Sequence, residues 1–300
     1  MSSYLEATAR ERLARLFDAG SFEEFIPPSR RVVSPHLGQL NAPVAFDDGV
    51  AVGRARLANR PVFVAAQEGG FMGGAVGEVH GAKLVGMLRR AIAVGESEAP
   101  DAVLLLLETG GVRLHEANAG LIAVSEVMRA VLDVRAAGIP VIALIGGSNG
   151  CFGGMGIVAR CTNAIVMSEE GRLAMSGPEV IETASGVEEF DARDRALVWR
   201  TTGGKHRYLI GEVQALVADD VAAFRAAALA RIDALGATAL TLAELEQEQA
   251  LLETRIEHYG HVREPYELWR AIGVPDPEAL PLLEADEFVA HVAPFRLGGH

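Results

Sequence analysis

Two apolar runs in this chain each lead into glycine doublets. Residues 102–107 are followed by Gly-Gly at 110–111, and residues 139–145 lead into the segment 146–154, which contains Gly-Gly twice. Apolar runs separated by helix-length segments are typical of parallel strands covered by helices. A strand that ends in glycines before a helix leaves backbone N–H groups without partners. The sequence therefore predicts an α/β fold with unpaired N–H groups beyond neighbouring strands.

Two such turns side by side can form an oxyanion hole without any catalytic side chain. One doublet alone is common turn punctuation. Two doublets after consecutive buried strands favour a functional role, because open α/β sheets bind ligands beyond the carboxyl ends of their strands. That arrangement suits chemistry on a thioester, in which the protein must stabilise an enolate.

The chain divides into three parts by pattern. Residues 1–43 are expected to contain a helical lead-in over 4–26, in which Gly20 ends the helix, and then a linker. Residues 44–235 alternate between strands and helices, and residues 236–300 read as a helical extension. The elements expected in the middle part are strands at 50–57, 61–67, 102–107, 140–145 and 163–167, helices at 81–92, 115–137 and 153–160, and a turn into 178–182.

Composition excludes several classes of protein. A net charge of −13 argues against a nucleic-acid-binding surface, which needs clustered positive charge. Cys151 and Cys161 are too few for a disulfide framework or a four-ligand zinc site, and no metal site is expected. No signal peptide and no run long enough to span a bilayer is visible. The sequence predicts a cytoplasmic protein with no membrane partner.

Several reactive residue types have plainer interpretations. Ser148 lacks an obvious base and is expected to cap its turn. Cys151 is expected to be a small packed residue. The glycine-rich segment 71–81 lacks the Gly-Lys-Ser/Thr ending of a phosphate loop. His115 and Glu116 follow the first doublet at the start of a helix, where a surface position is the default.

Four segments in register resemble the carboxyltransferase branch of the crotonase superfamily. They lie at Phe71–Gly81, Glu108–Glu116, Phe152–Ile157 and Ala174–Glu182, within a resemblance over about 45–235. Within that branch the chain resembles the beta subunits of biotin-independent malonate decarboxylases. It has no four-cysteine zinc ribbon, no room for a second crotonase-like half, and no Met-Lys-Met biotinylation site.

The resemblance implies a crotonase/ClpP-like stack of ββα units, of the carboxyltransferase N-half type, with the helical extension added. It implies loss of CO2 from a malonyl thioester on an acyl carrier protein, through an enolate. The N–H groups assigned to its oxyanion hole are those of Gly110, Gly111, Val112, Gly153 and Gly154. A proton must then reach the enolate carbon, from His115 or from water.

The resemblance also implies partners and a delivered cofactor. These are a homologous gamma subunit, an alpha subunit that exchanges acyl groups, and a small acyl carrier subunit. The chain itself should bind no cofactor and carry no biotin, because the carrier delivers the phosphopantetheine thioester. The basic residues expected to meet the carrier or its phosphate are Arg89, Arg90, Lys205 and Arg207.

Three other functions stay open. The chain could be half of a biotin-dependent acyl-CoA carboxyltransferase, which the motifs separate poorly from a decarboxylase. It could be a non-catalytic scaffold that binds an acyl thioester. A hydratase of the simpler crotonase type would need paired carboxylates near the oxyanion hole, and only Glu116 is placed for that role.

Overall fold

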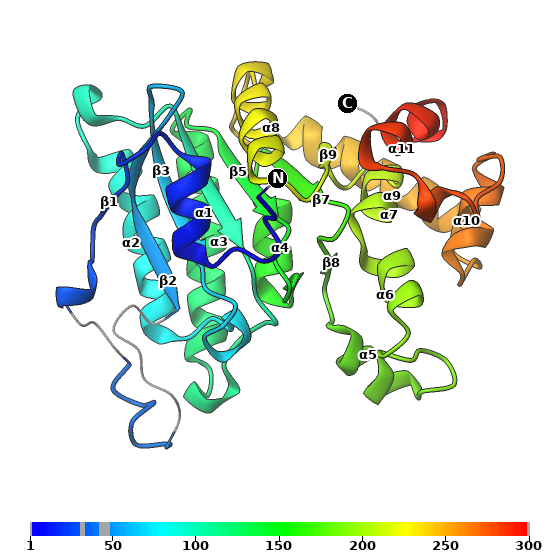
Figure 1. Cartoon of the computed structure of the whole chain (residues 1–300), viewed down its shortest axis with the longest axis horizontal. Coiled ribbons are helices and arrows are strands. Elements are labelled where there is room, and N and C mark those ends of the chain that lie inside the picture. Colours follow the sequence, from blue (N-terminus) through cyan, green and yellow to red (C-terminus); the bar gives the residue numbers. More distant parts are fainter. Residues whose placement is uncertain (1, 31–33, 42–48, 299–300) are drawn as a thin grey trace.

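The computed structural model describes residues 2–30, 34–41 and 49–298. Its centre is a seven-stranded sheet in the order β1-β2-β3-β4-β5-β7-β9, and a two-stranded sheet pairs β6 with β8 (Figure 1). The first three strands are antiparallel neighbours, and every pair from β3 to β9 is parallel. The strands are β1 Glu23–Glu24, β2 Val50–Leu57, β3 Arg60–Gln67, β4 Ala102–Leu107, β5 Val141–Ile145, β6 Cys151–Phe152, β7 Ala164–Ser168, β8 Leu173–Ala174 and β9 Ala215–Val217.

Helices cover both faces of the sheet. Helices α2, α3 and α4 lie on one face, and α1 and α8 lie on the other. The helices are α1 Ala9–Leu16, α2 Glu78–Ala93, α3 Ala119–Ala136, α4 Gly154–Cys161, α5 Pro178–Ser185, α6 Arg195–Thr202, α7 Gly204–Leu209, α8 Val221–Ala234, α9 Leu242–Tyr259, α10 Pro265–Ala271 and α11 Ala285–Val292. None of the helices in the described ranges is long and apolar enough to cross a membrane.

The strand β4 shows why its sequence is apolar throughout. Successive side chains of a strand point to opposite faces. Val103, Leu105 and Leu107 pack with α2 and α3, while Leu104 and Leu106 pack with α1 and α8, and all are fully buried. The prediction of parallel strands covered by helices is confirmed, and the helices lie on both faces.

The predicted helix over 4–26 is wrong in extent. Helix α1 begins after Thr8, whose side chain accepts a hydrogen bond from the N–H of Glu11 in a capping box. It ends at Leu16 because Asp18 is bound to the β2–β3 hairpin. The Asp18 carboxylate accepts hydrogen bonds from the N–H groups of Ala58 and Asn59, at 3.0 and 2.8 Å.

Two other element boundaries differ from the prediction. Helix α3 begins at Ala119, not at residue 115, because Ala117 has a φ of 49° and interrupts the helical path. The single turn Leu114–Glu116 precedes it as a 3-10 helix. Helix α2 begins at Glu78, three residues before the predicted start at 81. The turn expected to lead into 178–182 is followed by α5, which has Pro178 in its first turn.

The N-terminal segment shares its core with the middle of the chain. The rings of Tyr4 and Phe224 stack with centroids 4.0 Å apart, which joins the start of the chain to α8. The predicted boundary at 43–44 lies outside the described residues, and the division at 235 stays a prediction.

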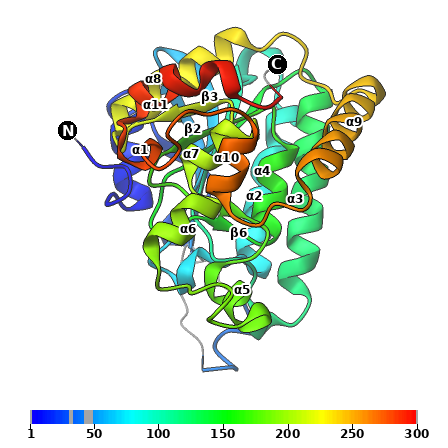
Figure 2. The ribbon, with the colours of Figure 1, turned by 90° about the vertical axis from the view of Figure 1, so that its right-hand side faces the viewer.

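Residues 236–298 include two kinds of helix. Helices α10 and α11 bury Trp269 and Phe288 against Leu209 of α7 and Leu216 of β9. Helix α9, in contrast, contains no buried residue and runs along the outer edge of the molecule (Figure 2).

Candidate active site

The turns that follow β4 and β5 lie against each other. The strands β4 and β5 are parallel neighbours, so both turns leave the same edge of the sheet. Thr109 N donates a hydrogen bond to Gly150 O at 2.8 Å, and Phe152 N donates one to Thr109 O at 2.9 Å. A Cβ atom added to Gly153 would lie 3.1 Å from Gly111 Cα. The doublet Gly110-Gly111 therefore lies against the doublet Gly153-Gly154, backbone to backbone.

Hydrogen bonds within these turns narrow the set of available donors. Gly110 N donates to Gly73 O at 2.8 Å, Gly111 N donates to Thr109 Oγ1 at 3.0 Å, and Gly153 N donates to Met175 O at 2.9 Å. The expectation that the N–H groups of Gly110, Gly111 and Gly153 face a ligand is therefore corrected. These three groups hold the turns in shape.

Two of the five assigned N–H groups have no hydrogen-bond acceptor in the described part of the chain. They belong to Val112 and Gly154. Gly154 is the first residue of α4, so its N–H also carries the positive end of the helix dipole. Of the five N–H groups, those of Val112 and Gly154 are therefore the two that stay available to a ligand.

Glycine is required at both Gly153 and Gly154. Gly153 has a φ of 65° and a ψ of −143°, a conformation that side chains disfavour. A Cβ at Gly154 would lie 2.6 Å from Val124 Cγ1 of α3, so the start of α4 sits directly on that helix. The doublet thus brings the N-terminus of α4 close to the first turn.

The other doublet, Gly146-Gly147, serves packing. A Cβ at Gly146 would lie 2.8 Å from the ring of Phe224, and one at Gly147 would overlap the side chain of Glu108. At Gly146 and Gly147 the glycines therefore allow a tight, closely packed turn, which is the common role of a glycine doublet.

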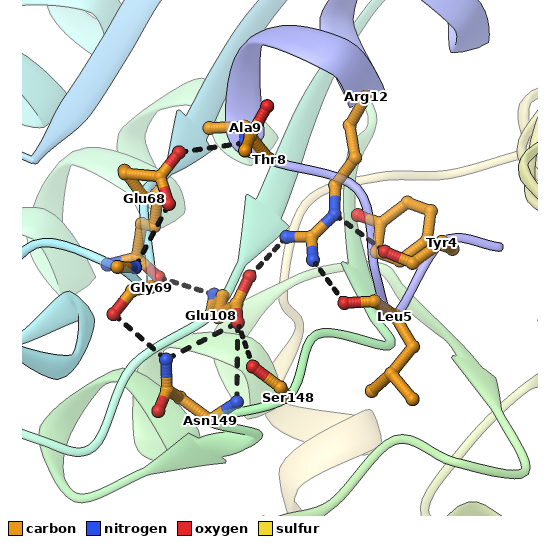
Figure 3. Close-up of polar contacts among 12 residues, drawn as sticks. Tyr4, Leu5, Thr8, Ala9, Arg12, Glu68, Gly69, Glu108, Ser148 and Asn149 are labelled. Carbon is orange, nitrogen blue, oxygen red and sulfur yellow. Dashed lines mark hydrogen bonds and ion pairs between the residues drawn. The ribbon is translucent and has the colours of Figure 1, made fainter.

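A buried carboxylate links the turns from behind (Figure 3). Glu108 is 4% exposed and forms an ion pair with Arg12 of α1, which is 1% exposed. Ser148 Oγ donates to Glu108 Oε1 at 3.1 Å, and Asn149 N donates to the same atom at 3.3 Å. The Ser148 hydroxyl therefore donates to this buried carboxylate instead of capping its turn.

Sequence reasoning missed Arg12 and Glu108. Glu108 directly follows six apolar residues, and a charged residue at that position must find a partner when it is buried. That signal was present, but the partner lies 96 residues earlier and no local pattern identifies it. Arg12 also donates to Tyr4 O at 2.9 Å, which anchors the start of the chain to the site.

Glu116 and Arg113 connect the N-terminus of α2 to the segment that follows β4. Glu116 Oε2 accepts a hydrogen bond from Glu78 N at 2.9 Å and lies 3.9 Å from Arg113 Nη1. Both charged side chains are fully buried. Glu116 thus stabilises the N-terminus of α2, where a negative charge is favoured.

His115 lies on the 3-10 turn next to Glu116 and is exposed. Among the described residues, its side chain forms no hydrogen bond, ion pair or ring contact. Cys151 is fully buried, and burial raises the pKa of its thiol. The prediction that Cys151 is a packed residue is confirmed.

A group that could offer ligands to a cation lies at the same end of α2. His36 Nδ1 is 2.8 Å from Glu78 Oε2, and one ligand atom of Glu116 lies within 4.8 Å of both. The guanidinium of Arg113 already balances the charge of Glu116 there. We therefore assign no metal to this group.

The four basic residues expected at the carrier do not form one patch. Arg89 and Arg90 lie on α2 and Lys205 and Arg207 on α7, at opposite sides of the molecule (Figure 1). Each is engaged, Arg89 with Glu126 at 3.1 Å, Arg90 over the ring of Phe25 at 4.8 Å, Lys205 with Glu169 at 3.1 Å and Arg207 with Glu212 at 2.8 Å.

Two hollows are relevant to ligand binding. One, of about 400 Å³, runs beside α4 and is lined by Ile157, Met175, Arg160 and Arg207, among others. Because Met175 O accepts a hydrogen bond from the N–H of Gly153, this hollow adjoins the turn that follows β5. The other, of about 290 Å³, lies among α6, α7 and α10 and is lined by residues that include His206.

The comparisons with known proteins agree with this architecture. The profile described as "Carboxyl transferase domain" matches residues 6–230. The malonyl-S-ACP:biotin-protein carboxyltransferase MADC of Malonomonas rubra is 44% identical over 315 residues, which cover 96% of this chain and 95% of that protein. The methylmalonyl-CoA carboxyltransferase 12S subunit of Propionibacterium freudenreichii subsp. shermanii is 32% identical over 72% of this chain and 38% of its own length.

Solved structures show the same fold. A chain of the Pseudomonas malonate decarboxylase hetero-tetramer, in complex with malonate, superposes with a TM-score of 0.82 and 39% identity, covering 90% of this chain and 97% of that chain. A chain of the transcarboxylase 12S hexamer gives a TM-score of 0.63 and 27% identity over 77% of this chain and 42% of that chain. The predicted crotonase-like carboxyltransferase fold is confirmed.

Proposed function

Because this chain belongs to the carboxyl transferase domain family, we propose that it is the beta subunit of a malonate decarboxylase. With a homologous gamma subunit, it decarboxylates malonyl-S-acyl carrier protein to acetyl-S-acyl carrier protein and CO2. Likeness over nearly the full length of two proteins supports the proposal. One is named for malonyl-S-ACP, and the other is one chain of a malonate decarboxylase hetero-tetramer.

The observation that carries the proposal is the pair of available N–H groups on adjoining turns, those of Val112 and Gly154. When the C–C bond to the carboxylate breaks, its electron pair delocalises onto the thioester oxygen as an enolate. Two fixed donors stabilise that charge more than the neutral carbonyl of the ground state. One such donor is worth about 2.7–4 kcal/mol in other enzymes.

Decarboxylation needs no general base, which suits a site built from backbone. The carbanion carbon must still receive a proton. His115 is exposed beside the turn and is the candidate donor on this chain, with water as the alternative. A donor on the gamma subunit would also complete the reaction, because the proposed site lies between the two subunits.

The hollow beside α4 is the proposed path of the phosphopantetheine arm. Its walls include Ile157 and Met175, which suit an alkyl chain. Arg207, which pairs with Glu212 in the same wall, would turn its guanidinium to the phosphate. The thioester would then reach the oxyanion turns at the end where Met175 binds Gly153. The carrier supplies this group, so the chain itself needs no bound cofactor.

The gamma subunit is proposed to cover apolar side chains of the segment between β4 and the first turns of α3. Leu114, Leu121 and Ile122 are 80%, 55% and 62% exposed there. Exposed apolar groups of this kind mark interaction sites. Residues 44–235 would form the carboxyltransferase domain of the complex, which also includes the acyl carrier and the alpha subunit, in the cytoplasm.

A second function is favoured by the relative from Malonomonas rubra. Its name describes transfer from malonyl-S-ACP to a biotin protein. The same enolate forms in that reaction, but the carboxyl group passes to biotin instead of leaving as CO2. The donor pair of Val112 and Gly154 would serve both reactions, so the two differ in the acceptor.

Avidin separates these functions. The complete complex, reconstituted with gamma, alpha and carrier subunits, is given malonyl-carrier thioester with and without avidin, and CO2 and acetyl-carrier are measured. Equal turnover in both samples is expected. Loss of turnover with avidin would assign the chain to biotin carboxyl transfer. An intact complex with no turnover in either sample would leave a scaffold that only binds the thioester.

A further inference from the structure

Helix α9 is well formed and yet buries no residue. It spans Leu242–Tyr259, and a capping box starts it, in which Thr241 Oγ1 accepts from Glu244 N at 3.2 Å. In proteins most of the stability of a helix comes from tertiary packing of one apolar face. Most of its surface is therefore available for a partner.

One side of α9 holds it to the body of the protein. Glu248 pairs with Arg160 of α4 at 2.9 Å, and Arg255 donates to Ile210 O. A Cβ at Gly298 would lie 2.8 Å from Leu251 on the same side.

A different side carries four exposed apolar residues, which we call the α9 seam. They are Leu242, Leu245, Leu252 and Ile256, exposed by 71%, 49%, 41% and 71%. Their spacing of three, seven and four residues matches the a and d positions of a heptad repeat, with Gln249 at the central a position. That pattern is the one by which helices pair side by side.

Next to the seam runs a row of carboxylates, Glu246, Glu253 and Glu257. At 3.6 residues per turn this acidic row lies roughly a quarter turn from the seam, on the side away from the body. No cation of residues 2–30, 34–41 or 49–298 forms an ion pair with any of the three. The acidic row is therefore uncompensated within this chain.

We propose that the α9 seam binds a helix of another protein whose own apolar seam is flanked by Lys or Arg. A second copy of α9 fits poorly. A parallel pair would oppose Glu248 of one copy to Glu253 of the other, and an antiparallel pair would oppose Glu246 to Glu253. A helix with Lys or Arg beside its apolar residues would pack against the α9 seam and would also neutralise the acidic row. The polar Gln249 calls for a polar residue opposite it, which fixes the register.

The test uses two designed helical peptides with leucine at a and d and one Asn at the central a position. One has Lys at the flanking positions and the other has Glu. Fluorescence anisotropy measures their binding to the full-length chain. We expect the Lys peptide to bind at least about tenfold more tightly than the Glu peptide, because like-charged flanks disfavour pairing. A Lys peptide with its leucines scrambled should bind at least tenfold more weakly.

Variants locate the binding. The double substitution L252E/I256E should weaken the Lys peptide at least tenfold, whereas L282E, at an apolar residue 84% exposed elsewhere, should leave it unchanged. The substitution E246K/E253K should reverse the preference, so that the Glu peptide binds more tightly. Such a gain of binding cannot arise from misfolding.

Three results would overturn the proposal. They are equal binding of the Lys and scrambled peptides, binding that survives L252E/I256E, and a charge reversal that leaves the preference unchanged. Sedimentation of the chain alone supplies another. A dimer that L252E/I256E dissociates would show that a second copy occupies the seam.

Discussion

The side chains of Arg12 and Glu108 form a buried ion pair that joins α1 to the residue after β4. Ser148 and Asn149 of the neighbouring turn donate to the same carboxylate. The pair therefore holds the N-terminal segment and both glycine-containing turns in one arrangement, although it takes no part in the proposed chemistry.

Removal of one partner of this pair should be costly, because the other charge stays buried. R12M and E108Q should each lower the free energy of unfolding by about 3–5 kcal/mol. The double variant R12M/E108Q should lose less free energy of unfolding than the sum of the losses in the two single variants. Urea denaturation measures all three. R54M, which breaks the exposed pair of Arg54 with Glu23, should cost at most about 1 kcal/mol. Additive losses in the double variant would refute the coupling.

The N–H of Gly154 can be removed without removal of the helix. Proline is tolerated in the first helical position, where it lacks only the N–H that has no partner within the helix. Its ring needs space that Val124 occupies, so the comparison is V124A/G154P with V124A/G154A, which has a Cβ and keeps the N–H. The proline variant should have a kcat about 10²–10³-fold lower, as for one lost oxyanion donor. Similar kcat values for the two variants would exclude Gly154 as a donor.

The fold was predictable from the sequence where its cause is local. The apolar residues of β4 and β5 and the glycines behind them indicated parallel strands and tight turns, and the structure contains both. The individual donors were not predictable. Whether Gly110 or Val112 has an available N–H depends on Gly73 O, which comes from a distant segment.

Long-range partners also explain the other differences. Helix α1 stops at Leu16 because Asp18 binds the β2–β3 hairpin, about 40 residues later. Lys205 is expected from the sequence to contact the carrier, yet its side chain is 15% exposed and donates to Pro281 O at 3.0 Å. The two carbonyl groups that it binds, those of Pro281 and Leu283, come from the C-terminal extension, which no pattern around residue 205 reveals.

The position of Arg207 predicts a specific effect on carrier binding. Arg207 lines the hollow beside α4, whereas Arg89 lies on α2 at the other side of the molecule. R207E should raise the KM for malonyl-carrier about tenfold and leave kcat within about twofold, because a lost phosphate contact weakens substrate and transition state equally. R89E is the matched charge reversal and should leave both constants unchanged. A rise in KM with R89E alone would place the carrier on α2 instead.

The imidazole of His206 should make the folded protein sensitive to acid. It is 8% exposed, and its Nδ1 accepts a hydrogen bond from Trp269 Nε1 at 3.2 Å. Burial, and to a smaller degree the charge of Arg207, lowers the pKa of His206 to about 3. The unfolded chain binds a proton at this residue near pH 6.5, so between pH 6.5 and 3 it holds more protons than the folded protein.

The free energy of unfolding should therefore fall as the pH falls through this range, by up to about 1.4 kcal/mol per pH unit from His206 alone. H206Q keeps an acceptor for Trp269 and cannot be protonated, so it serves as the matched control. Urea denaturation of both proteins at pH 7.5, 6.0 and 5.0 gives the difference between them. Wild type should lose stability relative to H206Q at each step below pH 6.5. A difference that stays constant with pH would mean that the folded protein protonates His206 as readily as the unfolded chain does.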